Sequence, residues 1–169
     1  MGNKTRRPIL EGKKALIVGI ANEHSIAYGC ARAFREAGAD IAITYLNDKA
    51  RPHVEPLAQA VESPLFLPLD VSKPGDTEAL FKRIRKEWGQ LDIFVHSIAS
   101  AKKEDIKGGL IDCSAEGFAM AMDISVHSFI RMARLAAPLM KDGGSMFAMS
   151  YHGAAKVVPN YNVMGPVKA

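Results

Sequence analysis

The sequence predicts an α/β fold, a Rossmann-like, doubly wound parallel sheet in three layers. Short, unbroken apolar segments, typical of strands buried on both faces, alternate along the chain with longer amphipathic segments, typical of helices. This alternation indicates parallel βαβ units with right-handed crossovers. The 169 residues suffice for one domain with a sizeable core, and no repeat or linker divides them. We therefore expect a single Rossmann-type domain over residues 1–169.

Five strands are expected. The first, at 14–18, reads KALIV and is followed by a glycine. The other four are expected at 41–45, 65–69, 91–96 and 145–150. Each is short and mostly apolar, as strands covered on both faces are.

Helices are expected between these strands, at 25–37, 51–61, 73–88 and 114–140. Gly38 and Gly89 follow the first and third of them, where a left-handed residue commonly ends a helix. Ser114 is the expected N-cap of the last, because its hydroxyl can accept a hydrogen bond from a first-turn N–H group.

Ligands of doubly wound sheets bind beyond the carboxyl ends of the strands, near the point where the strand order reverses. In this sequence those ends are Gly19, Tyr45, Asp70, His96 and Ser150. Alone, Asp70 is more typical of a turn or a helix cap, and His96 of a packed, hydrogen-bonded histidine. Together these ends define one candidate ligand-binding edge.

The segment from Gly19 to Gly29 links the first strand to the first helix but is not G-x-G-x-x-G. Gly19 permits a tight turn and a close approach of the backbone. Ser25 is placed to cap the helix and to donate its hydroxyl to a phosphate at the helix N-terminus. A strand–turn–helix without a ligand has the same pattern, so the loop by itself leaves both interpretations open.

The C-terminal segment contains two tyrosines ten residues apart, Tyr151 and Tyr161, and Lys168 seven residues after the second. A tyrosine and a lysine on neighbouring turns of one helix act together as a proton donor and its supporting charge. A loop tyrosine is more often a packing residue, but this spacing downstream of a βαβ scaffold favours a catalytic site.

Composition and charge argue against nucleic-acid-binding, metal-binding, disulfide-rich and membrane proteins. The net charge is +4, and five of the 22 basic residues lie in the first fourteen positions, at Lys4, Arg6, Arg7, Lys13 and Lys14. The run is short, so we interpret it as a solvated tail rather than a nucleic-acid or lipid-binding segment. Cys30 and Cys113 lack the spacing of a zinc site or disulfide framework. No apolar run reaches the length of a membrane span or signal peptide, so we expect a cytoplasmic protein with no metal, nucleic acid or membrane partner.

These features together resemble the short-chain dehydrogenase/reductase superfamily, and within it the bacterial enoyl-acyl carrier protein reductases. The matching segments are GIANEHSIAYG at Gly19, TYLND at Thr44, LDV at Leu69, HSIA at His96, DIS at Asp123 and PNYNVMG at Pro159. Most members of the superfamily carry Tyr-x-x-x-Lys. Here six residues separate Tyr161 from Lys168, and four separate Tyr151 from Lys156.

The resemblance implies a nicotinamide cofactor site and a catalytic centre. Tyr151, Tyr161 and Lys168 would be catalytic, Ala101 would contact the substrate, and Lys168 would also bind the nicotinamide ribose. The other implied cofactor-binding residues are Gly19, Ser25, Ile26, Leu46, Asp70, Val71 and Ile98. No arginine directly follows the second strand to hold a 2′-phosphate, so NADH is favoured over NADPH, although Lys49 and Arg51 lie close by. Leu46 stands where many NADH-using relatives have a glutamine.

The implied activity is NADH-dependent reduction of the trans-2 double bond of enoyl thioesters on acyl carrier protein, in fatty acid elongation, by a homotetramer. The resemblance also implies a further C-terminal third, with two more strands of an expected seven. We therefore expect this chain alone to be weakly active or inactive. Two alternatives remain: a cofactor-binding fragment without catalysis, and a 3-oxoacyl or ketone reductase of the same superfamily, which the Tyr–Lys spacing disfavours.

Overall fold

The computed structural model describes residues 8–169. The hypothesis about the basic N-terminal tail falls largely on Lys4, Arg6 and Arg7, outside the described residues. The other two members of that run are engaged in ion pairs: Lys13 Nζ lies 2.8 Å from Asp92 Oδ1, and Lys14 pairs with Asp40.

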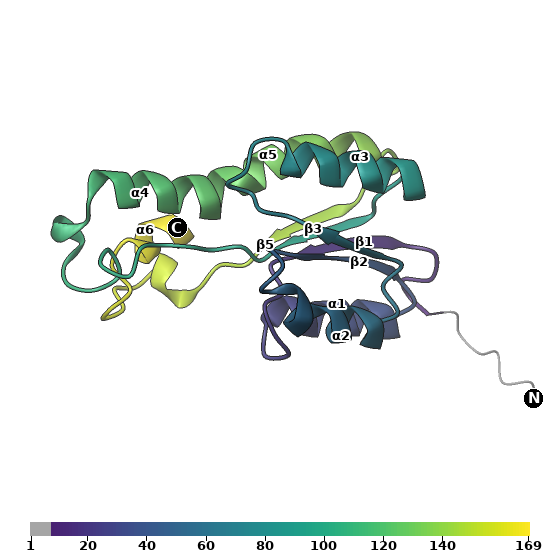
Figure 1. The fold of residues 1–169 in the computed structure, drawn as a ribbon, viewed down its shortest axis with the longest axis horizontal. Helices are drawn as coiled ribbons and strands as arrows, with labels where there is room; N and C mark the ends of the chain where they lie inside the picture. Colours follow the sequence, from purple (N-terminus) through teal and green to yellow (C-terminus); the bar gives the residue numbers. More distant parts are fainter. Residues whose placement is uncertain (1–7) are drawn as a thin grey trace, which may run out of the picture.

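Five parallel strands form one sheet in the order β3-β2-β1-β4-β5 (Figure 1). They are β1 (Lys14–Val18), β2 (Asp40–Tyr45), β3 (Leu65–Pro68), β4 (Ile93–His96) and β5 (Ser145–Ala148). All five predicted strands are confirmed. The fifth ends two residues early because its partner ends first: the last pair in the register is His96 with Ala148. The strand order reverses direction between β1 and β4, which is the topological switch point.

The helices cover both faces of the sheet, as predicted, and make the three layers. Helices α1 (Ile26–Glu36) and α2 (Arg51–Ala60) lie on one face, and α3 (Asp76–Trp88) and α5 (Ser128–Ala136) on the other (Figure 1). Strand β1 alternates between the two cores. Ala15 and Ile17 pack among the residues of the α1 and α2 side, and Leu16 and Val18 among those of the α3 and α5 side.

The segment predicted as one helix over 114–140 is helical throughout most of its length but changes pitch. It consists of α4 (Ala115–Met122), a π-helical turn (Asp123–His127), α5, and a 3₁₀ turn (Ala137–Leu139). Ser114 is its N-cap, as expected, and its Oγ accepts a hydrogen bond from the N–H of Gly117 at 3.0 Å. Apolar periodicity did not predict the π turn.

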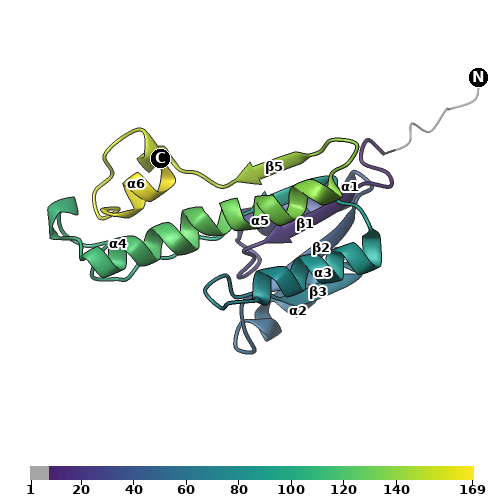
Figure 2. The same ribbon diagram turned by 90° about the horizontal axis from the view of Figure 1, so that it is seen from above.

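Helices α4 and α6 (Met164–Lys168) extend beyond the carboxyl edge of the sheet (Figures 1 and 2). They have a small core of their own, formed by Ala121, Val163, Met164 and Val167. Tyr161 precedes α6, so the prediction that Tyr161 and Lys168 share a helix was wrong. Asn160 and Asn162 on either side of Tyr161 have φ values of 59° and 26°, which a right-handed helix does not allow.

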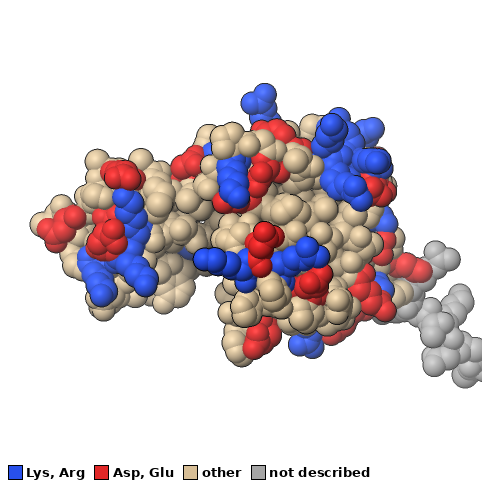
Figure 3. Space-filling model, viewed as in Figure 1, with Lys and Arg blue, Asp and Glu red and all other residues tan. Residues whose placement is uncertain are grey.

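Acidic and basic side chains are mixed over most of the face shown in Figure 3. Basic side chains gather over the C-terminal end of α3, whose last turn carries Arg85 and Lys86, a favourable position at the negative end of a helix dipole. That end is opposite to the carboxyl ends of the strands. None of the helices in residues 8–169 has the length and apolar character needed to cross a membrane.

Candidate functional site

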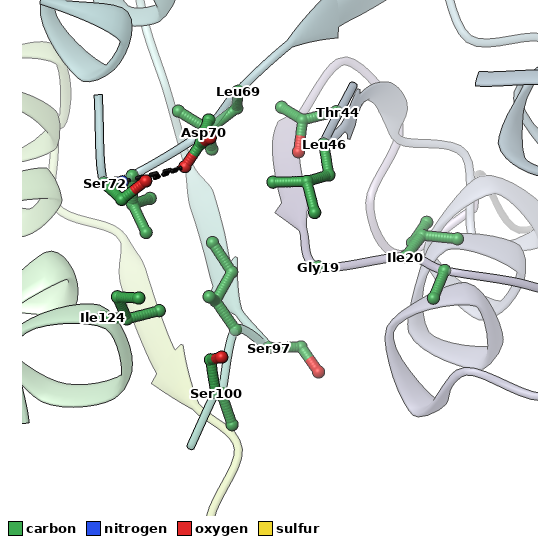
Figure 4. A pocket seen from close by; sticks show the side chains of 14 residues that line it. Gly19, Ile20, Thr44, Leu46, Leu69, Asp70, Ser72, Ser97, Ser100 and Ile124 are labelled. Carbon is green, nitrogen blue, oxygen red and sulfur yellow. Dashed lines mark hydrogen bonds between the residues drawn. The ribbon is translucent and has the colours of Figure 1, made fainter. Parts of the chain in front are cut away.

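A pocket of about 420 Å³ opens at the switch point, where β1, β2, β3 and β4 end (Figure 4). This volume is typical of small-molecule sites, which span roughly 300–1,000 Å³. The lining residues are Gly19, Ile20, Ala21, Thr44, Leu46, Leu69, Asp70, Val71, Ser72, Ser97, Ile98, Ala99, Ser100 and Ile124. Five of the eight residues predicted for the cofactor therefore surround one cavity: Gly19, Leu46, Asp70, Val71 and Ile98.

Gly19 brings the ends of β1 and β4 into direct contact. Its φ is +94°, and a Cβ atom there would lie 2.2 Å from the carbonyl oxygen of Ser97. Any other residue would both strain the backbone and collide with the neighbouring strand. The predicted tight turn and close approach are thus both present, and they set the floor of the pocket.

Ser25 organises the loop between β1 and α1 differently from the expectation. It is the N-cap residue of α1, but its side chain makes no capping bond. Instead its Oγ accepts hydrogen bonds from the N–H groups of Ala21 at 3.0 Å and Asn22 at 3.1 Å, which folds the loop back on itself. The Ser25 side chain therefore accepts no hydrogen bond from the first-turn N–H groups of α1, and these groups form the positive end of the helix dipole. Ile26 is 68% exposed and does not line the pocket.

Asp70 serves as a turn residue and a pocket residue at once. Its Oδ1 accepts hydrogen bonds from the N–H of Ser72 at 3.0 Å and from Ser72 Oγ at 2.6 Å (Figure 4). Its own N–H donates to Asp76 Oδ2 at 3.2 Å. Across the pocket Leu46 is half-exposed and presents an apolar surface.

His96, at the end of β4, is a packed residue, as expected. It is 2% exposed, and its Nε2 lies 2.8 Å from Ser128 Oγ. Its ring meets Phe94 and Phe129 edge-on. Burial, and then the charge of Lys168, lower the pKa of His96 to about 4, so the imidazole is neutral at neutral pH.

The chain after β4 forms the pocket wall next to the π turn. Ser97 and Ser100 line the pocket, although only the small-residue character of this segment pointed to them in the sequence. The Ser125 hydroxyl accepts from the N–H of Ser100 at 3.0 Å and donates to the Ser100 carbonyl at 3.2 Å. Ile124 of the same turn lines the pocket on the side opposite Gly19 and Ile20 (Figure 4).

The two predicted tyrosines meet. The ring centroids of Tyr151 and Tyr161 are 4.9 Å apart, with 59° between the ring planes. Gly153 makes room for both, because a Cβ there would lie 2.6 Å from Tyr161 Cδ1 and 3.2 Å from Tyr151 Cδ1. The sequence analysis did not single out this glycine. Its position two residues after Tyr151 is the feature that could have pointed to it. Burial, and then the neighbouring Tyr151, raise the pKa of Tyr161, so its phenol stays protonated and able to donate a hydrogen bond.

Lys168 is held at the end of β5. Its Nζ donates to the carbonyl of Met149 at 2.6 Å, its own carbonyl accepts from Ser150 Oγ at 2.8 Å, and burial lowers its pKa. Ala101 packs partly buried against the core of α4 and α6. Neither Lys168 nor Ala101 is among the residues that line the switch-point pocket.

Cys30 and Cys113 are free thiols. Among the described residues, no three histidine, cysteine, aspartate or glutamate side chains are grouped in a way that would hold a metal ion.

Known proteins resemble this chain in sequence and in structure. A family profile described as Enoyl-(Acyl carrier protein) reductase matches residues 19–169. The enoyl-(acyl-carrier-protein) reductase (NADH) of Aquifex aeolicus is 52% identical over 162 residues, which are 95% of this chain and 60% of that protein. The chain thus spans about 60% of the length of this relative.

Two solved structures superpose on 95% of the chain. The enoyl-(acyl-carrier-protein) reductase of Anaplasma phagocytophilum, in complex with NAD, has a TM-score of 0.91 at 44% identity, with 61% of its own chain covered. The enzyme of Bacillus cereus, with NADP+ and an indole naphthyridinone, has a TM-score of 0.91 at 39% identity, with 63% covered. With a profile match over nearly the whole length, a doubly wound parallel sheet and a pocket at its switch point, this chain belongs to the enoyl-(acyl carrier protein) reductase family.

Proposed function

We propose that this chain provides the NADH site and the tyrosine–lysine centre for reducing the trans-2 double bond of an enoyl thioester carried on acyl carrier protein, a step of fatty acid synthesis. The observation that carries the proposal is the contact between Tyr151 and Tyr161, at the edge of the sheet where Lys168 is held. Membership of the family supports it.

The switch-point pocket suits a dinucleotide. Gly19 allows the end of β1 to lie against Ser97 and so shapes the floor of the pocket. The N-terminus of α1 supplies a positive dipole end for a pyrophosphate, and Asp70 and Val71 form a wall suited to an adenine ring. NADH remains favoured over NADPH. Arg51, a candidate partner of a 2′-phosphate, is already bonded to Glu55 at 3.1 Å and lies over a tyrosine ring. The Aquifex relative is an NADH enzyme by name.

A bound NADH would supply a hydride to C3 of the conjugated double bond. Negative charge then develops on the thioester oxygen, and the protonated Tyr161 hydroxyl donates a hydrogen bond to it, an oxyanion-hole role. Lys168 would add positive potential and hold the ribose hydroxyls of the cofactor. The proton at C2 comes from Tyr151, from a water molecule or through a relay.

The separation of Tyr161 from Lys168 fits an enoyl substrate better than a ketone. In a ketone reductase the carbon that accepts the hydride is bonded directly to the oxygen that is protonated. In an enoyl thioester that oxygen lies two carbons further away, so the donor must stand further from the nicotinamide. The turn of Asn160 and Asn162 places Tyr161 outside α6, which supplies such a displacement.

The homotetramer and the cytoplasmic location remain proposals. Phe118 of α4 and Ile130 of α5 are large apolar side chains, 43% and 57% exposed, and they support the burial of these helices in an assembly. Sedimentation velocity measures the assembly state, and a monomer at all concentrations would rule out a tetramer of this chain.

The test follows the loss of reduced-nicotinamide absorbance with crotonyl and longer enoyl thioesters, beside a fluorescence titration of NADH binding. Tyr161→Phe is expected to leave NADH binding unchanged and to lower kcat by roughly 10²–10³, the usual effect of removing an oxyanion donor. Tyr151→Phe tests the C2 proton, because it slows turnover only if Tyr151 supplies that proton. Tyr28→Phe, on a partly buried tyrosine of α1, is the matched control.

The outcomes separate the alternatives. Enoyl turnover that is lost in Tyr161→Phe but not in Tyr28→Phe supports the proposal. NADH binding without turnover identifies a cofactor-binding fragment. Faster reduction of 3-oxoacyl thioesters than of enoyl thioesters identifies a ketone reductase and refutes the assignment.

A further inference from the structure

Arg131 of α5 connects that helix to the pocket wall formed by the loop after β3. Its Nη2 donates a hydrogen bond to the carbonyl of Val71 at 2.9 Å, across 60 residues of sequence. Its Nη1 donates to Asp123 Oδ1 at 2.5 Å and lies 2.8 Å from His127 Nδ1. The Arg131 side chain is 30% exposed, so this fork is partly shielded from water.

The π turn makes this arrangement possible. In a regular α-helix residues eight apart, such as Asp123 and Arg131, would point in directions roughly 80° apart, since each residue turns the helix by about 100°. One extra residue in a π turn reduces that difference to about 20°. Asp123 can therefore hold the guanidinium from the same side of the helix, with a second nitrogen left free for Val71. The pairing lowers the pKa of Asp123, chiefly through the hydrogen bond from Arg131, so the carboxylate stays charged.

The carbonyl that Arg131 binds belongs to the loop between β3 and α3. Asp70, Val71 and Ser72 of this loop all line the pocket. The loop is also tied to β2, because the N–H of Leu69 donates to the carbonyl of Tyr45 at 2.9 Å, and to α3, because the N–H of Asp70 donates to Asp76 Oδ2. Arg131 is the side chain from α5 that hydrogen-bonds this loop, so it helps to fix the position of this wall relative to Ile124.

We propose that Arg131 is a positioning residue for the adenosine half of the dinucleotide: through Val71 it sets the wall against which the adenine lies, without touching the cofactor itself. This inference rests on the proposed cofactor site. It differs from a general bracing of the helix, because a brace would affect the whole chain, whereas a positioning role affects only ligands that contain adenosine.

The experiment measures dissociation constants of this chain for NADH, ADP-ribose and reduced nicotinamide mononucleotide, which lacks the adenosine. Arg131→Met removes both donors and keeps the length of the side chain, and Arg131→Lys keeps the charge and one donor. Arg134→Met, on an exposed arginine of the same helix, is the matched control. Hydrogen exchange of residues 69–76 reports on the loop without any ligand.

Arg131→Met is expected to raise the dissociation constants for NADH and ADP-ribose by about threefold to tenfold, because a charge-assisted hydrogen bond to the wall is lost. The dissociation constant for the mononucleotide should change by no more than a factor of about two. Arg131→Lys should give dissociation constants for NADH and ADP-ribose between those of Arg131→Met and the unsubstituted chain, and Arg134→Met should leave all of them unchanged. Exchange of residues 69–76 should quicken in Arg131→Met alone.

Equal weakening of all three ligands, or no weakening of any, overturns the positioning role. If the unsubstituted chain binds none of the three, the cofactor proposal itself fails, and the adenosine role of Arg131 fails with it. The two failures can be told apart, because the positioning role is tested only when the unsubstituted chain binds the ligands, whereas the cofactor proposal fails when it binds none of them.

Discussion

Acid is predicted to destabilise this chain through His96. The imidazole is almost fully buried at the end of β4, with Ser128 as its polar partner and two phenylalanine rings beside it. Burial first, and then the ammonium of Lys168, hold its pKa at about 4, against an ordinary value of 6.5. The perturbation is a fall in pH, compared between the unsubstituted chain and His96→Gln, which keeps a polar group and does not titrate.

The size of the effect follows from the two pKa values. The folded value is the lower, so the unfolded chain takes up the proton first, and protonation favours unfolding. The stability contributed by a neutral His96 is complete above about pH 6.5 and is lost as the pH falls towards 4. The linkage relation gives a loss of about 2 kcal/mol at pH 5 and about 3 kcal/mol at pH 4.

Urea unfolding at pH 7, 5 and 4 provides the measurement. Between pH 7 and pH 5 the free energy of unfolding should fall by about 2 kcal/mol more in the unsubstituted chain than in His96→Gln, whatever the stabilities of the two at pH 7. Carboxylates common to both variants cancel in this difference. His24→Gln, on a side chain that is 86% exposed, is the control and should keep the pH dependence of the unsubstituted chain. Parallel pH profiles for the unsubstituted chain and His96→Gln would refute the reasoning.

The remaining predictions concern stability and use the same unfolding measurement. Gly19→Ala should destabilise the chain by at least about 2 kcal/mol, because its methyl group would meet the Ser97 carbonyl at a positive φ. Gly29→Ala, in the interior of α1 with nothing within 4 Å of the added atom, should stabilise it by about 0.5–1 kcal/mol. If Gly29→Ala destabilised the chain as much as Gly19→Ala, the close approach of Gly19 to Ser97 would not explain the effect of Gly19→Ala. Ser114→Ala should cost about 1 kcal/mol through the lost cap on the N–H of Gly117, and an unchanged urea midpoint would contradict the capping role.

Most of the fold was predictable from local pattern. A strand such as Lys14–Val18 is buried on both faces, so its apolar run is unbroken and identifies it without any tertiary information. Alternation of such runs with amphipathic helices leaves few topologies, of which the observed order is the usual one. The strand ends were less predictable. Ala148 is the last residue of β5 because β4, its partner, stops at His96.

The candidate site was predictable only in part. Gly19 and Asp70 follow strands directly, and parallel strands end at one edge, so their common pocket follows from sequence order. The hydroxyl of Ser25 had two possible sets of partners, the helix or the loop, and the folded loop decides for Ala21 and Asn22. No sequence rule separates these choices, since both satisfy backbone N–H groups equally well.

The sequence by itself determined the parallel sheet, the glycine turn after β1 and the presence of two tyrosines and a lysine near the C-terminal end of the chain. Only the tertiary structure decided that the tyrosine rings meet over Gly153, that a π turn interrupts the long helix, and that Arg131 reaches Val71. The physical reason is range. Strand and helix patterns arise from neighbours a few residues apart, whereas these contacts join residues up to 60 positions apart, whose distance is set by packing.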